Sequence, residues 1–284
     1  MGTDVELLLE PRRDHGRDAR RALHAAEAEL DRLESLLSRF RPDSELSRLN
    51  AAGGGPAGRD LVEVTVTALA ARDRTGGRFD PTVHDALVQA GYADTFERVA
   101  ADGPARPLTA RCAGRVEVDV ARRRIELGPG VRLDLGGIAK GYAVDRACRI
   151  LSEAGPCLVN AGGDLAVSGR PRTGVWPVGV ETPDGPLTLG LAEGAVATSG
   201  RDRRAWRRGG EERHHLIDPA SARPSTSDLE RVTVLAGTAA DAEVLATALF
   251  MAGSTAAAAE AEASSIAAVL VTRDARTMLT GALR

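Results

Sequence analysis

Apolar residues recur every three or four positions in a long segment near the start of the chain, from about Asp18 to Arg41. This spacing gathers them on one face of a helix and leaves the charged side chains off that face. The charges are therefore expected to form a solvated helix surface rather than a binding site. Pro42 should stop the helix, because proline cannot continue it. The apolar positions are Ala19, Ala22, Leu23, Ala26, Leu30, Leu33, Leu37 and Phe40.

Elsewhere, short apolar segments separated by glycine and proline predict many strands and a few helices. The glycine-rich residues 50–58 are expected to form a flexible loop; they lack the Gly-Lys-Ser/Thr ending of a phosphate-binding loop. Because strands and helices are segregated, the pattern favours an α+β fold with mixed or antiparallel sheets. Helices are expected at 61–74, 138–154, 239–252 and 254–263. Strands are expected at 3–9, 116–120, 124–127, 131–135, 158–160, 165–167, 176–181, 187–191, 195–198, 214–217, 232–235, 266–271 and 277–283.

Length and charge narrow the class of protein. The 284 residues suit a single domain, 1–284, or two intimately packed lobes. The formal net charge is −3 with both signs interspersed, and aromatic residues make up 3%, so a nucleic-acid partner is not expected.

Cysteine usage and the termini suggest a compartment. Three widely spaced cysteines without a CxxC pair argue against a zinc ribbon or a disulfide scaffold, and fit a reducing compartment. No apolar stretch reaches the length of a transmembrane segment, and the N-terminus shows neither a signal peptide nor a lipid-anchor signal. These features predict a cytoplasmic protein.

The strongest candidate for chemistry is the segment Leu133–Asp145. A predicted strand ends in Asp134, two glycines turn the chain, and a helix begins whose free N–H groups suit an anion such as a pyrophosphate. Lys140 adds a movable positive charge one turn into the helix. On spacing alone, an ordinary strand–turn–helix with surface charges is an equally good interpretation.

Weaker candidates follow. The turns Ala161–Asp164 and Ala197–Gly200 are, taken singly, best explained as plain turns. His215 and Asp218 stand close enough for an acid–base site, although a surface strand with idle histidines is favoured on pattern alone. Glu243 and Thr247 share one helix face at i and i+4 and carry the hard oxygen ligands that Mg²⁺ prefers. Taken singly the pair is not persuasive, because a helix-surface Glu and a Thr packed against the core explain it without a metal.

Taken in order, these segments resemble the FAD:protein FMN transferase family, the ApbE-like flavin transferases formerly described as thiamine-biosynthesis lipoproteins. Each piece is weak alone, whereas so many in the right order are hard to obtain by chance. The resemblance covers nearly the whole chain. It is carried by Met1–Thr3, Phe40–Asn50, Gly77–Val83, Leu133–Asp145, Leu158–Gly169, Val175–Pro183, Ala197–Gly200, His214–Pro219, Val232–Leu235 and Ala242–Leu249.

The resemblance implies an α+β fold with helices packed around a deep FAD cleft. It also implies Mg²⁺-dependent transfer of the FMN half of FAD to a Thr or Ser hydroxyl of an acceptor protein, with release of AMP. The residues implied for flavin binding are Met1, Arg78, Phe79, Asp80, Asp134, Lys140 and Ile217. Those implied for the metal are the Gly137 carbonyl, Glu243 and Thr247.

Two departures from the family pattern concern the metal. Glu243 stands where the family usually has Asp, and Ala246 stands where some members carry a second Asp. For catalysis, His215 is the candidate general base, with an ordinary pKa of about 6.5, and Asp218 is the acid beside it. Positioning of FAD is the alternative role for His215. Two rival functions stay open: an FAD pyrophosphatase that uses water, and a non-catalytic FAD-binding protein.

Overall fold

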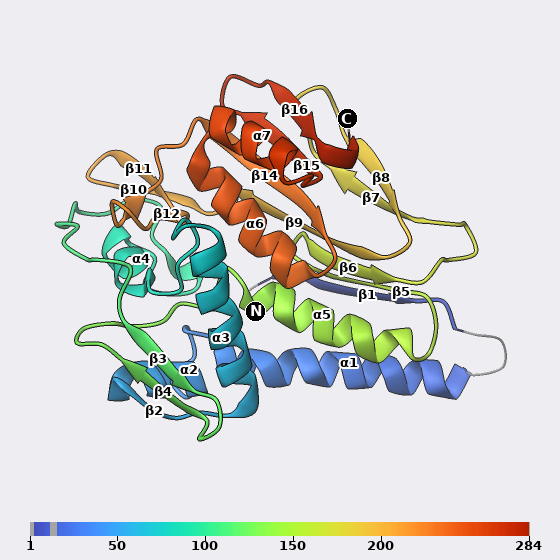
Figure 1. Cartoon of the computed structure of the whole chain (residues 1–284), viewed down its shortest axis with the longest axis horizontal. Coiled ribbons are helices and arrows are strands. Elements are labelled where there is room, and N and C mark those ends of the chain that lie inside the picture. Colours follow the sequence, from blue (N-terminus) through green and yellow to red (C-terminus); the bar gives the residue numbers. More distant parts are fainter. Residues whose placement is uncertain (1–2, 12–15, 284) are drawn as a thin grey trace.

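The computed structural model describes residues 3–11 and 16–283, and its centre is a seven-stranded antiparallel sheet (Figure 1). Only β5–β6 and β15–β16 are neighbours joined by hairpins, and the β5–β6 hairpin turns at Gly162 and Gly163, both of which have positive φ. In spatial order the strands are β1 (Val5–Leu9), β5 (Cys157–Ala161), β6 (Asp164–Ser168), β9 (Gly194–Gly200), β14 (Leu229–Ala236), β15 (Ala268–Thr272) and β16 (Thr277–Thr280).

Helices cover one face of this sheet and a two-stranded ribbon covers the other (Figure 1). Helix α5 (Ala139–Ser152) packs on β5 and β6, and α6 (Ala239–Ala252) packs on β9 and β14. Helix α1 (Gly16–Leu37) lies along α5, and α7 (Ser254–Ala263) follows α6. The ribbon of β7 (Trp176–Val180) and β8 (Leu187–Leu191) buries an apolar cluster against the opposite face.

The remaining elements lie beside the seven-stranded sheet. Three strands form a small sheet in the order β2-β4-β3, and two further pairs, β10–β11 and β12–β13, are hairpins. The bounds are α2 (Glu45–Ala52), β2 (Gly54–Pro56), α3 (Arg59–Arg74), α4 (His84–Ala90), η1 (Phe96–Arg98), β3 (Val116–Asp119), β4 (Arg124–Leu127), β10 (Ala205–Arg208), β11 (Glu211–His214), β12 (Ile217–Asp218), β13 (Arg223–Pro224) and η2 (Gly281–Leu283).

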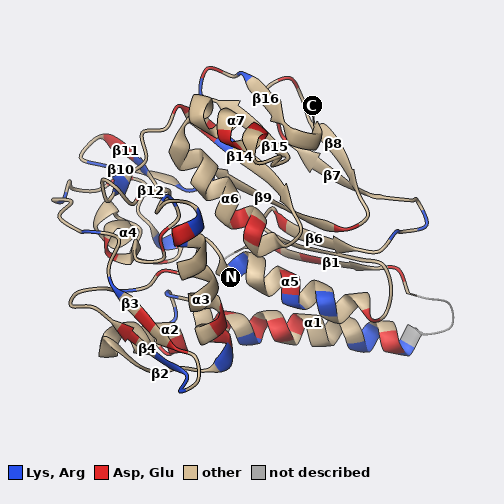
Figure 2. Ribbon diagram, viewed as in Figure 1, with Lys and Arg blue, Asp and Glu red and all other residues tan. Residues whose placement is uncertain are grey.

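Helix α1 shows why the periodic pattern was informative. Its stripe of Ala26, Leu30, Leu33 and Leu37 is buried against α5, while charges of both signs line the outer face (Figure 2). The helix ends at Leu37 and not at Arg41 as predicted. Beyond Leu37 the chain turns, and Arg39 pairs with the buried Asp134, with Nε and Oδ2 2.7 Å apart.

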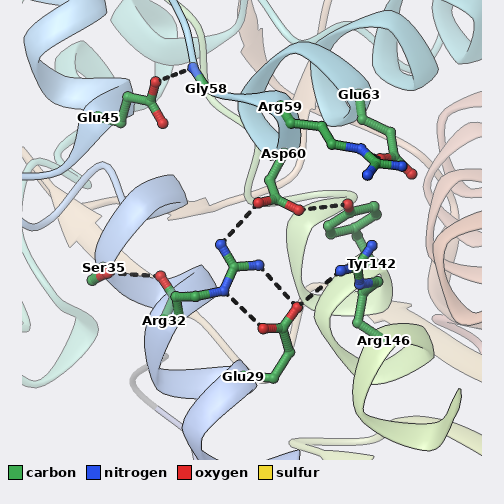
Figure 3. A network of polar contacts seen from close by, with 10 residues as sticks. All are labelled: Glu29, Arg32, Ser35, Glu45, Gly58, Arg59, Asp60, Glu63, Tyr142 and Arg146. Atoms are coloured by element: carbon green, nitrogen blue, oxygen red, sulfur yellow. Dashed lines mark hydrogen bonds and ion pairs between the residues drawn. The ribbon is translucent and has the colours of Figure 1, made fainter. Parts of the chain in front are cut away.

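A polar network fastens α1 to its neighbours (Figure 3). Arg32 on α1 donates hydrogen bonds to Glu29 on the same helix and to Asp60 on α3. Tyr142 on α5 donates to the other oxygen of Asp60 at 3.1 Å, and Arg146 lies 3.3 Å from Glu29. Three helices are therefore joined by charge-assisted contacts.

The predicted strand at 131–135 is absent. Residues 131–135 pair with no strand. Instead, the Asn50 side-chain amide bonds the Leu133 N–H and carbonyl, each at 2.8 Å. The predicted strand at 214–217 is also wrong, because β11 ends at His214, the chain bends at His215, and β12 begins at Ile217. Both segments are held by contacts that hydrophobic periodicity does not report.

The predicted flexible loop at 50–58 is wrong as well. Helix α2 runs to Ala52, begins at a Ser44 cap that accepts from Ser47 N, and ends at Gly53 in the left-handed conformation. Strand β2 follows directly. The α+β class itself is confirmed, with helices packed against antiparallel sheets. No helix within residues 3–11 and 16–283 combines the length and apolar character that crossing a bilayer requires.

Candidate active site

Two adjoining cavities, of about 200 and 140 Å³, form a cleft between the N-terminal end of α5, the side of α6 and nearby loops. The larger cavity is lined by apolar groups of α1 and α5 and by the rings of Phe40, Tyr92 and Phe96. The smaller one holds most of the polar side chains singled out from the sequence. The side chains and backbone shared by both walls are those of Arg39, Phe40, Tyr92, Gly136, Lys140 and Arg204.

The turn that precedes α5 forms one wall. Asp134 is buried; its Oδ1 accepts from Gly136 N at 2.7 Å, and its Oδ2 lies 2.7 Å from Arg39 Nε. A Cβ at Gly137 would lie 3.1 Å from the Phe79 ring, so glycine permits the turn to pack closely. The start of α5 faces the cleft. Ile138 N and Ala139 N both donate to Leu135 O, so the positive end of the helix dipole, rather than a row of free N–H groups, is what favours an anion here.

Three charged side chains converge in the smaller cavity. Lys140 on α5 forms ion pairs with Asp164, at the β5–β6 turn, and with Glu243 on α6, where Nζ lies 2.5 Å from Oε1. The other oxygen of Glu243 accepts from Gly141 N at 3.0 Å. The side chains of Asp164 and Glu243 are 5% and 6% exposed, so the cluster is largely removed from water.

Burial and mutual charge set the pKa values of this cluster. Burial raises the pKa of Glu243, and the neighbouring Lys140 ammonium only partly offsets that effect. Burial opposes the charged form of Lys140, but the charges of Asp164 and Glu243 outweigh it and raise the pKa of Lys140. Lys140 is therefore cationic at neutral pH.

The donor set suits a hard divalent cation. Thr247 lies one turn after Glu243 on α6, and its hydroxyl is 2.9 Å from Ser199 Oγ. Gly137, Asp164, Glu243 and Thr247 all line the smaller cavity. In the part of the chain that the structure describes, no three His, Cys, Asp or Glu side chains are grouped to hold a metal. A metal here would need the two carboxylates, the Thr hydroxyl and the Gly137 carbonyl together.

The two adjacent histidines have different surroundings. His214 is buried; its Nε2 lies 3.0 Å from Ser225 O, and its Nδ1 accepts from Leu216 N at 3.3 Å. These two contacts fix the tautomer of His214 and use both of its ring nitrogens, so its role is structural. Burial lowers the pKa of His214 to about 4. His215 lines the smaller cavity, and its buried Nδ1 has no hydrogen-bond partner among the described residues.

His215 is neutral at pH 7. Burial, followed by the charge of Arg204, lowers its pKa well below the usual histidine value. The expectation of an ordinary pKa near 6.5 is therefore wrong, although a neutral imidazole with a free nitrogen still suits a proton acceptor.

The other residues expected to bind flavin lie at the rim and wall of the same cavity. Arg78 is paired with Glu260 on α7, with Nη1 and Oε2 2.7 Å apart, and Phe79 and Ile217 are buried apolar lining. The Asp80 carboxylate accepts from Thr82 N at 2.8 Å and from Ala113 N at 2.6 Å. Asp80 therefore holds the backbone at Thr82 and Ala113 in place beside the cavity.

One residue predicted for catalysis is not brought to the cleft, and one predicted for flavin binding cannot be placed. Asp218 does not line either cavity, and its carboxylate accepts from Ala220 N at 3.0 Å within its own turn. The structure thus gives no support to Asp218 as a partner of His215. Met1 lies outside the described residues.

Comparison with known proteins agrees with this geometry. A sequence model of the ApbE family matches residues 1–270. The chain belongs to the ApbE family.

Relatives in the ApbE family cover most of the chain. The FAD:protein FMN transferase of Treponema pallidum is 33% identical over 263 residues, which are 81% of this chain and 72% of that protein. The corresponding protein of Haemophilus influenzae is 29% identical and covers 87% and 77%. The ApbE protein of Thermotoga maritima superposes with a TM-score of 0.83 at 27% identity, covering 98% of this chain and 94% of that one. The apo flavinyl transferase ApbE of Pseudomonas stutzeri gives 0.78 at 27% identity, covering 98% and 95%.

Sequence reasoning missed two residues of this ApbE-family cleft, Arg39 and Asp164. Arg39 stacks 4.1 Å above the Phe40 ring and 4.6 Å from the Tyr92 ring, and its buried Nη2 has no hydrogen-bond partner in the described part of the chain. Asp164 was treated as part of a plain hairpin. A signal was available for Asp164, since an acid directly after two turn glycines stands at a strand end.

Proposed function

We propose that this protein transfers the FMN moiety of FAD to a Thr or Ser hydroxyl of an acceptor protein, with release of AMP and dependence on Mg²⁺. The observation that carries the proposal is the convergence of Lys140, Asp164, Glu243 and Thr247 beside the N-terminus of α5. A pyrophosphate and a divalent cation need these two kinds of group side by side. The names of the ApbE relatives support the substrate class.

The residues of the chain divide the work between binding and proton transfer. The positive end of the α5 helix dipole and the Lys140 ammonium supply positive charge to a pyrophosphate. The Phe79 and Ile217 side chains and the apolar larger cavity give surface against which flavin and adenine rings can be buried. The Nη2 of Arg39, which lacks a partner among the described residues, is a donor available to the ligand.

The bond changes are those of a phosphoryl transfer. The acceptor hydroxyl oxygen forms a bond to the FMN phosphorus, the bridging P–O bond breaks, and AMP leaves with the bonding pair. His215 takes the hydroxyl proton at Nδ1 or holds the acceptor oxygen in place. When bound by Gly137, Asp164, Glu243 and Thr247, Mg²⁺ would offset negative charge on the pyrophosphate.

We also infer that residues 1–284 act as a single unit. The cleft takes its lining from Leu33 near the start of the chain to Met251 near its end, so neither half could form it alone.

The proposal is tested by the mass of an acceptor. The protein is incubated with FAD, Mg²⁺ and a domain that carries a flavin-acceptor Thr, and the acceptor is then weighed. We expect a gain equal to one FMN less water, and no gain when that Thr is replaced by Ala. Glu243→Ala should abolish the gain, and circular dichroism checks that the variant is folded, because the substitution leaves the buried Lys140 with Asp164 as its one remaining carboxylate partner in the cluster. Full transfer by Glu243→Ala would overturn the metal assignment.

A further inference from the structure

Lys140 occupies the position between Asp164 and Glu243 that a shared cation would take. Its ammonium contacts both carboxylates, and the second oxygen of Glu243 is engaged by Gly141 N. Among the contacts of the described residues, both oxygens of Glu243 are therefore already in use. A divalent cation must displace at least one of these partners before it can bind Glu243.

Electrostatics make Lys140 the partner that has to move. The Gly141 N–H belongs to the helix backbone and cannot turn away, whereas Lys140 has a flexible side chain, 22% exposed, that lines both cavities. An ammonium and a divalent cation on the same buried carboxylates repel each other strongly, because little water screens them. The site thus holds one cation or the other.

We propose that Lys140 is the resident counter-ion of Asp164 and Glu243, and that the pyrophosphate of FAD opens the divalent-cation site by drawing Lys140 away. This inference rests on the proposed function and adds an order to it: FAD first, metal second. The anion attracts the ammonium toward the N-terminus of α5, two carboxylates are released together, and their charge is then available to the metal. Coupling is reciprocal, so the metal in turn tightens FAD binding.

The test measures metal binding without FAD and without turnover. Mn²⁺ is used as the probe, and free Mn²⁺ is followed by electron paramagnetic resonance during titration of the ligand-free protein. The native protein should bind Mn²⁺ weakly. Lys140→Met should bind it about tenfold tighter or more, the size of effect that removal of one close like charge produces. Lys140→Met that binds no tighter than the native protein would overturn the proposal.

Arg204→Met is the matched control. Arg204 lines both cavities but forms no ion pair with Asp164 or Glu243. Its removal lowers the positive charge of the cleft without freeing a carboxylate, and should change Mn²⁺ affinity by less than about threefold. If Arg204→Met and Lys140→Met gained Mn²⁺ affinity equally, the cause would be the net charge of the cleft and not Lys140 occupying the carboxylates. That result would also overturn the proposal.

A second variant serves as the control for misfolding of Lys140→Met. Lys140→Met leaves two buried carboxylates without their cation, which destabilises a protein. Lys140→Met combined with Asp164→Asn restores the charge balance while keeping Glu243 and Thr247, and it should still bind Mn²⁺ more tightly than Asp164→Asn alone. Because this assay contains neither FAD nor acceptor, its failure leaves flavin transfer untouched. If the native protein failed to transfer flavin while Lys140→Met bound Mn²⁺ tightly, only the proposed function would be overturned.

Discussion

At the scale of single residues, the two adjacent histidines divide structure from chemistry. His214 uses both ring nitrogens to hold the chain near Ser225, whereas His215 keeps Nδ1 free in the cleft. His215→Ala should therefore slow transfer by about 100-fold or more and change FAD affinity by less than about threefold, since a base acts mainly in the transition state. Stopped-flow rates and flavin-fluorescence titration give the two quantities. His24→Ala, on an exposed helix face, is the control.

Equal losses in rate and in affinity would reduce His215 to a binding residue. A normal rate would remove it from the site altogether.

The pH dependence of transfer follows from the lowered pKa of His215. Its unprotonated form is the active one, and that form is already complete at pH values above the usual histidine pKa of about 6.5. The contribution of His215 to the rate should be constant from about pH 6.5 upward and fall only at more acidic pH. Comparing the pH profiles of the native protein and His215→Ala isolates this contribution. A His215-dependent inflection at or above the usual pKa would contradict the account.

The sequence could identify some of these residues and not others. Glu243 and Thr247 are one helical turn apart, so their shared face follows from local geometry alone. Asp164 and Arg39 reach the cleft through contacts with residues more than twenty positions away, Lys140 and Asp134 respectively. No periodicity encodes such pairs. The lowered pKa of His215 likewise arises from burial by distant segments.

At the scale of elements, the contact between α5 and α6 determines the geometry of the charged cluster. A Cβ at Gly141 would lie 2.5 Å from backbone atoms of Ala239 and Ala240, which cannot give way as a side chain can. Gly141→Ala should push the helices apart and reduce the free energy of unfolding by about 1–3 kcal/mol, the usual cost of overpacking. Urea denaturation measures this loss.

Gly237→Ala provides the comparison, because a Cβ there meets nothing within 4 Å. It should leave the unfolding free energy within about 0.5 kcal/mol of the native value. Similar effects of the two substitutions would argue against close packing at Gly141.

The network of Figure 3 should make the attachment of α1 depend on pH. Hydrogen bonds from Arg32 lower the pKa of Glu29. Burial raises the pKa of Asp60, but bonds from Arg32 and Tyr142 outweigh it and lower that pKa too. A carboxyl group whose pKa is lower in the folded than in the unfolded protein stabilises the fold at pH values above its unfolded-state pKa, about 4. This stabilisation is lost as the pH falls through the folded-state pKa.

Arg32→Met should therefore lower the free energy of unfolding by about 1–2 kcal/mol at pH 7 and by much less near pH 3. Denaturation with urea at both pH values checks the difference. Arg59→Met removes an exposed partner of Glu63 nearby and should have little effect at either pH. A penalty for Arg32→Met that did not shrink in acid would show lost packing rather than lost charge pairing.

Elements with strong local signals were predictable. The predicted helices at 239–252 and 254–263 are confirmed with the observed bounds, because Thr238 caps the first and the Gly253 carbonyl accepts from Ala257 N at the start of the second. The conformation of residues 131–135 was not predictable in this way. Their apolar pattern suggested a neighbouring strand, whereas the Asn50 side chain takes that place. Residues that line a cleft are often held in this irregular way.

At the scale of the whole molecule, membership of the ApbE family and the shape of the cleft lead to the same class of reaction. The sheet and its helices serve to bring four distant segments, near residues 39, 137, 164 and 243, to one place (Figure 1). Replacing the usual Asp by Glu243 keeps a carboxylate at this place, and the structure shows it within reach of Lys140 and the start of α5.

The most direct test of flavin transfer compares two products of one reaction. The protein, FAD, Mg²⁺ and an acceptor domain are mixed, and released AMP and acceptor-bound flavin are both quantified over time. Transfer predicts that the two rise together in a ratio of one to one, with free FMN absent. AMP accompanied by an equal amount of free FMN, and no flavin on the acceptor, would show that water is the attacking group and would contradict the account.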